Sequence, residues 1–334
     1  FFSAVPYSLS PMPSTVLCLG EILFDCLADQ LGKPYEAVES WTPYPGGAPA
    51  NVACGLVKLG TSAGLIGCVG DDEPGHQLMN LLQEVGVEIS GMQRHPQAPT
   101  RQVYVVRTEE GDRQFAGFGE VASDEFADTR LDGAQIPESL FESAEFLVMG
   151  TLAMAYPESN QAIARCRALA RQSGVKVFID VNWRPVFWPD VESAKATIRK
   201  AIADADLLKL SDEEAEFLFN TSVVTEVATQ LPNVSRVIVT RGDRGCGYCF
   251  GDVVGDIEAF SVPVQDTTGA GDGFIAGFLH QLQNQGLDAL DEPASARKVM
   301  KYASAVGALT AMKPGAIAAQ PTAEEVQQFL QGRP

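Results

Sequence analysis

The stretch at residues 266–273, which reads "DTTGAGDG", constrains the fold more than any other, because it runs directly into an apolar segment from Phe274 to Leu282. A polar turn with alternating glycines before a helical pattern is predicted to present backbone N–H groups at a helix N-terminus. Such an end attracts anions, and phosphate above all. Asp272 is then expected in or beside the first helical turn, where a carboxylate can accept a proton from a hydroxyl near that phosphate.

A glycine-rich helix start carrying a first-turn charge is the simpler interpretation of any single residue in this stretch. It does not explain why two aspartates bracket two threonines and two glycines. The GxxxxGK[ST] phosphate loop occurs nowhere in the chain, and the GxGxxG pattern of dinucleotide-binding enzymes does not follow the first predicted strand. The stretch therefore indicates a phosphate site of another design.

Charge and hydropathy exclude several classes of protein. The chain of 334 residues has 43 acidic and 24 basic residues, a formal charge of −19 at pH 7. Broad binding to nucleic acid or to anionic membranes needs a basic surface, so neither is expected. No apolar run approaches the roughly 18 residues that span a bilayer. A phosphate ligand must therefore be held locally, by amides, a metal ion and a few cations.

The cysteines and histidines argue against disulfide, redox and histidine-based sites. Seven scattered cysteines predict reduced thiols in a cytoplasmic protein. Cys246 and Cys249 form a CxxC, but their flanks predict a turn that enters a strand, and hence buried strand cysteines. The three histidines, His76, His95 and His280, lie too far apart in sequence to suggest a metal site or a triad.

Residues 1–14 are left outside the predicted domain. They contain three prolines and no basic residue, unlike a signal peptide. We expect a disordered or artificial start, with Met12 as an alternative natural beginning.

Short apolar runs alternate with longer helical patterns along the rest of the chain, which predicts βαβ units and a mostly parallel sheet covered by helices. The expected strands are 16–19, 63–69, 146–149, 177–179, 207–210 and 236–239. The expected helices are 50–59, 75–85, 158–173, 191–203, 212–219, 270–285, 294–312 and 322–330.

Two segments break this alternation. Residues 29–45 are polar with aromatics, and residues 101–107 and 113–118 resemble two strands joined by a turn. Both are expected to form a small lid sheet, with lid segments around 29–45 and 100–119 of a single domain spanning 15–330. Ligands of open α/β sheets bind beyond the carboxyl ends of the strands, where a lid excludes water.

A second chemical stretch, "PGGAPANVA" at residues 45–53, precedes a predicted helix. Gly46 and Gly47 permit close approach of the backbone, and Asn51 has donor and acceptor groups suited to sugar hydroxyls. Asp25 follows the first predicted strand and is able to accept two hydroxyl protons. The alternative for Asp25 is a turn residue at the end of a strand.

Together, "DTTGAGD" and "GGAPAN" resemble the two signatures of the PfkB (ribokinase-like) carbohydrate kinases, and they are about as far apart as in that family. "DVNWRP" at 180–185 and "LLKLSDEEAEFL" at 207–218 are similar to further elements of its fructokinase branch. "VIVTRGDRGCGY" and "SAVGALTAMKPGAI" resemble its nucleotide-side segments. One departure is that fructokinases often have an arginine before "SAD", whereas "FAGFGEVASDEF" has none.

The resemblance implies a ribokinase-like fold, with a Rossmann-like three-layer α/β core and a β-sheet lid. It implies transfer of the γ-phosphoryl group of MgATP to a primary hydroxyl of a ketohexose, fructose to fructose 6-phosphate. The alternatives are another small polyol (2-keto-3-deoxygluconate, ribose or a nucleoside) or a non-catalytic, kinase-like interaction protein. Lid sheets of this family often pair, which implies a homodimer.

The resemblance also implies roles for individual residues. Asp272 acts as the base, and the amides of Gly269, Ala270 and Gly271 hold the transferred phosphoryl group. The implied sugar ligands are Asp25, Gly46, Gly47, Asn51 and Arg184. The implied nucleotide-side residues are Lys209, Ser211, Glu214, Thr240, Gly242, Gly245 and Gly315, and Asp266 and Thr268 would hold a monovalent cation such as K⁺. Ser211 and Glu214 also fit a helix capping box, and the two roles are compatible.

Overall fold

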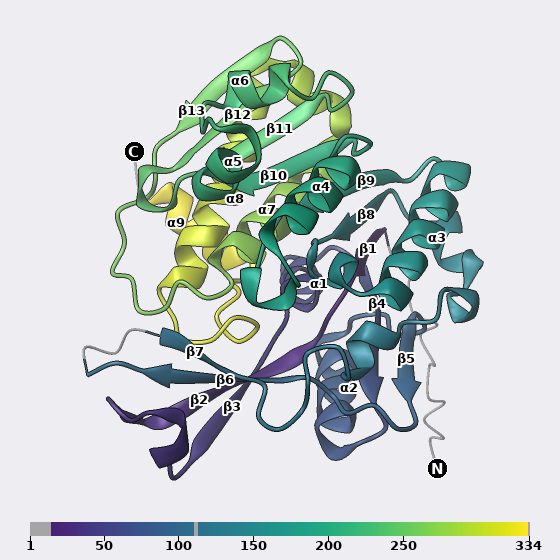
Figure 1. Cartoon of the computed structure of the whole chain (residues 1–334). Helices are drawn as coiled ribbons and strands as arrows, with labels where there is room; N and C mark the ends of the chain where they lie inside the picture. The colour runs from purple at the N-terminus through teal and green to yellow at the C-terminus, as the bar shows by residue number, and fades with distance from the viewer. Residues whose placement is uncertain (1–14, 110–112, 333–334) are drawn as a thin grey trace, which may run out of the picture.

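The computed structural model describes residues 15–109 and 113–332 (Figure 1). The expectation for residues 1–14 lies outside the described residues.

A nine-stranded sheet forms the centre of the body, in the order β13-β12-β11-β10-β9-β8-β1-β4-β5. Neighbours from β11 to β5 pair in parallel, and β12 and β13 add antiparallel strands at one edge. The strands are β1 (Val16–Leu19), β4 (Ala63–Gly70), β5 (Met92–His95), β8 (Phe146–Met149), β9 (Lys176–Asp180), β10 (Leu207–Ser211), β11 (Arg236–Thr240), β12 (Cys246–Phe250) and β13 (Val253–Ile257). The predicted, mostly parallel sheet is confirmed.

Helices cover both faces of this sheet, because successive side chains of each strand point to opposite faces. In β1, Val16 and Cys18 pack into one core and Leu17 and Leu19 into the other. The first face is covered by α1 (Ala48–Lys58), α2 (Glu73–Val85), α7 (Ala270–Gln285), α8 (Pro293–Ala311) and α9 (Ala323–Gln331). The second is covered by α3 (Pro157–Ser173), α4 (Val191–Ile202), α5 (Asp212–Phe219) and α6 (Val224–Thr229).

A separate four-stranded sheet, which we call the lid, lies at the lower left of Figure 1. Its order is β3-β2-β6-β7, from β2 (Leu23–Leu31), β3 (Trp41–Gly46), β6 (Gln102–Arg107) and β7 (Arg113–Gly117). Its first strand begins at Leu23, ahead of the predicted lid segment 29–45. The earlier start was not predicted because the first residues of β2 are apolar and resemble any buried strand. Asp25 therefore lies within a lid strand, and its alternative role as a strand-end turn residue is wrong.

Some helices and strands were not predicted from the sequence. Short β5 and α6 lack a clear periodicity, and 3-10 turns occupy much of 127–142. All seven cysteines are free. Of the CxxC pair in β12, Cys246 is buried as predicted, but Cys249 is only partly buried because it lies on the other face of the strand. In the part of the chain that is described, every helix is too short or too polar to cross a membrane.

Candidate active site

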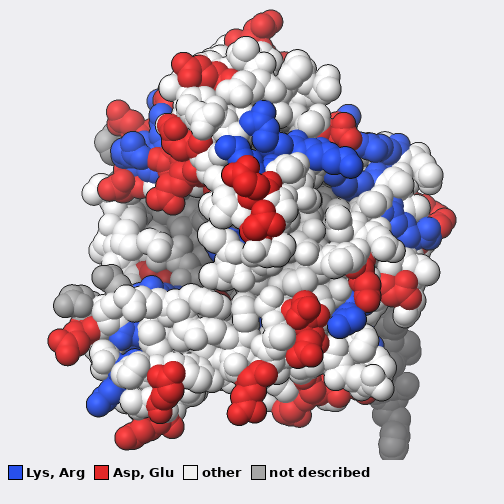
Figure 2. All heavy atoms as spheres, in the orientation of Figure 1, with Lys and Arg blue, Asp and Glu red and all other residues white. Residues whose placement is uncertain are grey.

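The predicted site residues gather at the carboxyl ends of adjacent strands. β9 ends at Asp180, and its neighbour β10 carries Lys209 directly opposite. β10 ends at Ser211, paired with Thr240 at the end of β11. Parallel pairing brings these ends to one edge of the sheet, so three separate sequence segments meet there. Figure 2 shows this face of the molecule hollowed between the lid and the body.

Helix α7 begins where the sequence predicts, and its first turn presents unpaired N–H groups. Gly269 caps it with φ 76°, and a Cβ there would lie 2.9 Å from the Ala316 Cβ, so this turn needs glycine. The Ala270 N–H donates to the Thr267 carbonyl at 3.2 Å. The N–H groups of Gly269, Gly271 and Asp272 have no protein acceptor within residues 15–109 and 113–332. They lie at the positive end of the helix dipole, which suits an anion, and we call this group of N–H donors the anion hole.

Asp272 faces Asn51 across this anion hole, although 221 positions separate them. Asn51 Nδ2 donates to Asp272 Oδ2 at 2.8 Å. Burial raises the pKa of Asp272 to about 6, against the opposing effect of this hydrogen bond. Asn51 is itself buried, and its Oδ1 finds no donor among the described residues. A buried acceptor without a partner is costly, so Oδ1 is suited to a ligand hydroxyl.

The start of α1 places Asn51. Gly47 precedes the helix with φ 103°, and a Cβ there would lie 2.5 Å from the Glu21 carbonyl oxygen. Glu21 accepts the Ala48 N–H at 3.2 Å, and burial raises its pKa to about 7. This role of Glu21 was not predicted, because its place after the first strand is the only sign of it in the sequence. At Gly46, a Cβ would lie 2.8 Å from Asp25 Oδ2, so glycine leaves room for that carboxylate.

Arg184, in the loop after β9, links Asp25 of the lid to Asp272 of the body, because its charge acts on both carboxylates. Burial raises the pKa of Asp25 to about 6, and the positive charges of Arg113 and Arg184 oppose that rise. The Arg184 guanidinium is exposed, donates to the Trp183 carbonyl, and also favours ionisation of Asp272. The structure thus brings together the predicted sugar ligands and the predicted base.

Lys209 lies beneath the anion hole. Its Nζ donates to Asp180 Oδ1 at 2.8 Å, and both side chains are 8% exposed. A Cβ on Gly271 would lie 3.6 Å from this Nζ. Burial opposes the charge of Lys209, but the carboxylates of Asp180 and Glu214 outweigh it and raise its pKa. Lys209 therefore fixes a positive charge under the N-terminus of α7.

Ser211 and Glu214 form the capping box at the start of α5. Ser211 Oγ accepts the Glu214 N–H at 3.1 Å, and Glu214 Oε2 accepts the Ser211 N–H at 2.8 Å. Glu214 Oε1 also accepts the Trp183 N–H at 2.7 Å, which ties α5 to the loop after β9. Burial and the neighbouring Asp180 raise the pKa of Glu214. The capping interpretation is confirmed, and both oxygens already accept N–H donors.

The remaining nucleotide-side residues lie in turns. Thr240 Oγ1 donates to the Leu210 carbonyl at 3.4 Å. Gly242 and Gly245 adopt φ of 58° and 85°, and a Cβ on Gly245 would meet the Ile257 oxygen at 1.9 Å. Gly315, with φ 84°, donates its N–H to Asp266 Oδ2 at 3.0 Å.

The predicted cation ligands hold a protein side chain in this structure. Arg113 donates to Asp266 Oδ2 at 2.7 Å and to Thr268 Oγ1 at 2.6 Å. Arg113 was predicted only as the start of a lid strand, because nothing local in the sequence marks it as a partner of Asp266. Within residues 15–109 and 113–332, no three His, Cys, Asp or Glu side chains gather to form a metal centre.

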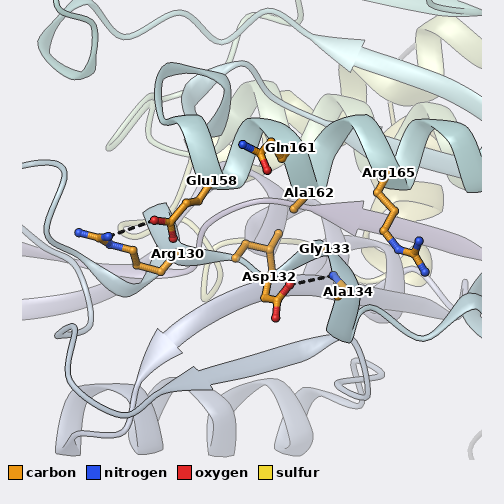
Figure 3. Close-up of a pocket in the computed structure, with 9 residues that line it drawn as sticks. Arg130, Asp132, Gly133, Ala134, Glu158, Gln161, Ala162 and Arg165 are labelled. Carbon is orange, nitrogen blue, oxygen red and sulfur yellow. Dashed lines mark hydrogen bonds and ion pairs between the residues drawn. The ribbon is translucent and has the colours of Figure 1, made fainter.

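A pocket of about 410 Å³ lies elsewhere, between α3 and the 3-10 turns at 127–135. Figure 3 shows its charged side chains turned toward protein partners, with Arg130 paired to Glu158 and Asp132 accepting the Ala134 N–H. None of the predicted site residues lines it. The charged side chains of this pocket pair with other protein groups and give no sign of a ligand. The candidate active site therefore remains at the carboxyl ends of β9, β10 and β11.

The sequence matches the profile of the pfkB family carbohydrate kinases over residues 13–323. A protein named probable fructokinase-6, chloroplastic, from Arabidopsis thaliana is 35% identical over 321 residues, 94% of this chain and 82% of that protein. Fructokinase-2 from Solanum lycopersicum is 32% identical over 320 residues, 95% of this chain and 96% of that protein.

Solved structures show the same similarity. A fructokinase from Xylella fastidiosa with bound ATP superposes with a TM-score of 0.86 at 29% identity, covering 96% of this chain and 99% of that one. A fructokinase from Vibrio cholerae, bound to fructose, ADP and calcium, superposes with a TM-score of 0.82 at 27% identity, covering 95% and 99%.

Proposed function

The chain belongs to the pfkB family of carbohydrate kinases, and we propose that it transfers the γ-phosphoryl group of ATP to the primary hydroxyl at C6 of fructose. The observation that carries the proposal is the pairing of Asp272 with Asn51 beside the free N–H groups of Gly269 and Gly271. A base and an anion hole at one helix end are what in-line phosphoryl transfer needs. The fructokinase names of the relatives and structural neighbours favour fructose as the acceptor.

Each residue has one task in this proposal. Asp272 removes the proton of the attacking hydroxyl, and the anion-hole amides stabilise charge on the transferred group. Asp25, Asn51 and Arg184 bind and orient the sugar. Gly46 and Gly47 let the backbone approach it, and the buried Asn51 Oδ1 accepts one of its hydroxyls. The turns with Thr240, Gly242, Gly245 and Gly315 receive the nucleotide.

Magnesium fits the residues present as a phosphate-bound ion. Mg²⁺ keeps several waters and needs few protein carboxylates, and Glu214 has lone pairs left beyond its two N–H donors. Asp180 and Glu214 would hold such an ion through its water, and Mg²⁺ would neutralise charge on the phosphates. Potassium does not fit the described Asp266–Thr268 turn in the same way, because the Arg113 guanidinium already donates hydrogen bonds to the side chains of both residues.

A coupled ADP-release assay over a sugar panel tests the acceptor. Fructose, ribose, 2-keto-3-deoxygluconate and a nucleoside are offered with MgATP, and phosphorus NMR identifies the product. We expect the highest kcat/KM for fructose and phosphate on C6. A higher value for another polyol would replace fructose as the substrate, and absence of ADP release with every acceptor would favour a non-catalytic, kinase-like protein.

We also propose a cytoplasmic location and a homodimer formed through the lid. The seven free cysteines favour a reducing compartment. Leu31, Tyr44 and Phe115 are large apolar side chains left exposed on lid strands, which favours a partner surface there. Fractionation of cells expressing the protein tests the location, and mass photometry tests the dimer.

A further inference from the structure

Arg113 joins the lid to the body at the turn that precedes the anion hole. It begins β7, the edge strand of the lid, and its guanidinium reaches Asp266 and Thr268, which lie 153 and 155 positions further along the chain. One N–H donates to a carboxylate and another to a hydroxyl, at 2.7 and 2.6 Å. Two directed, charge-assisted contacts fix the orientation of the guanidinium as well as its position.

Asp266 is an ionised carboxylate with little free surface. Burial alone opposes ionisation, but the N–H groups of Gly315 and Thr268, together with Arg113, outweigh it and lower the pKa of Asp266. Its side chain is 7% exposed, and Oδ2 already accepts from Gly315 and from Arg113. A metal ion that used Oδ2 and the Thr268 hydroxyl would have to displace the guanidinium, because two positive charges there repel each other.

We propose that the Arg113 guanidinium takes the place of a monovalent cation at the Asp266–Thr268 turn, and that this contact clamps the lid over the bound sugar. Arg113 is a positioning residue that acts through the turn and the lid. Its charge also favours ionisation of Asp25, the proposed sugar ligand on β2, as it does that of Asp266. The effect on sugar binding rests on the proposed function, whereas the exclusion of the ion does not.

The test compares wild type with Arg113→Gln and Arg113→Lys in K⁺ and in tetramethylammonium at equal ionic strength. For wild type we expect the same Tm, kcat and KM in both salts. Arg113→Gln should raise the KM for the sugar about tenfold, the scale of a lost charge-assisted contact. K⁺ should raise the Tm of this variant and lower its KM, since an ion that binds the folded state stabilises it. Arg113→Lys should stay insensitive to K⁺.

Arg107→Gln is the matched control. Arg107 lies directly opposite Arg113 in the β6–β7 ladder, but it donates to the Ala28 and Asp29 carbonyls within the lid. We expect wild-type KM and no response to K⁺. The clamp is overturned if wild type itself gains Tm and activity in K⁺, or if Arg113→Gln and Arg107→Gln behave alike. The Tm comparison decides on ion exclusion even if no sugar in the panel is phosphorylated.

Discussion

The body and the lid hold their functional side chains in different ways. The body strands β1 and β8 are buried at every residue, and Lys209 and Asp180 form an ion pair almost without solvent. In the lid, β7 has no buried residue, and Arg113 is 35% exposed while it reaches its body partner. Packing from both sides fixes side chains rigidly, whereas a thin sheet is held in place by few contacts. The body is therefore suited to the chemical step and the lid to closure over the sugar.

Lys209→Met tests the body at a buried charge. We expect the free energy of unfolding to fall by about 3–5 kcal/mol, because Asp180 and Glu214 lose their buried counter-charge. Urea unfolding measures the change. The Arg113–Asp266 pair should matter far less, because Arg113 is 35% exposed and the Gly315 and Thr268 N–H groups still donate to Asp266 without it, so Arg113→Gln should cost at most about 1 kcal/mol. Equal costs for the two variants would remove the distinction between the regions.

Asp272→Asn tests the chemical role of the body. The variant keeps the shape of the side chain and its contact with Asn51, so we expect normal folding and ATP binding. The kcat should fall about a hundredfold or more, which is the scale of a lost general base. ADP release measures kcat, and isothermal titration with ATP provides the control. Turnover close to wild type would rule out Asp272 as the base.

Asp25→Asn tests the carboxylate of the lid. Burial raises the pKa of Asp25 to about 6, the same value as for Asp272 in the body. We expect the KM for the sugar to rise about tenfold, as for a lost hydrogen bond to a charged group, with a smaller change in kcat.

The pH profile separates the two carboxylates. Both act ionised, so in wild type kcat/KM should rise steeply with pH below about 6 and level above it, with two protons lost. In Asp25→Asn, the rise of kcat/KM below pH 6 should be less steep and should correspond to the loss of one proton. An unchanged slope in that variant would show that the lid carboxylate does not act in its ionised form.

The sequence predicted parts of both regions: the lid strands β6 and β7 lie where two strands were expected, whereas β5 and α6 of the body were not predicted. Helix α7 begins at Ala270 as expected, and the capping box of Ser211 and Glu214 is present. Both follow from local rules, since glycine conformation and cap spacing act within a few residues. The lid strand β2 was placed too late because its apolar start reads like any buried strand.

By itself, the sequence determined the parts whose geometry is local: the glycine turn that starts α7 at Gly269, the place of Asp272 in its first turn, and the capping box of Ser211 and Glu214. Of the three predicted phosphate amides, Gly269 and Gly271 are free in the described chain, whereas the Ala270 N–H donates to the Thr267 carbonyl. Backbone conformation and helix phase set these positions, and both are written into short stretches. Only the tertiary structure decided the pairs, Asn51 with Asp272 across 221 positions and Arg113 with Asp266 across 153. Such contacts depend on how whole helices and sheets pack, and no spacing in the chain encodes them directly.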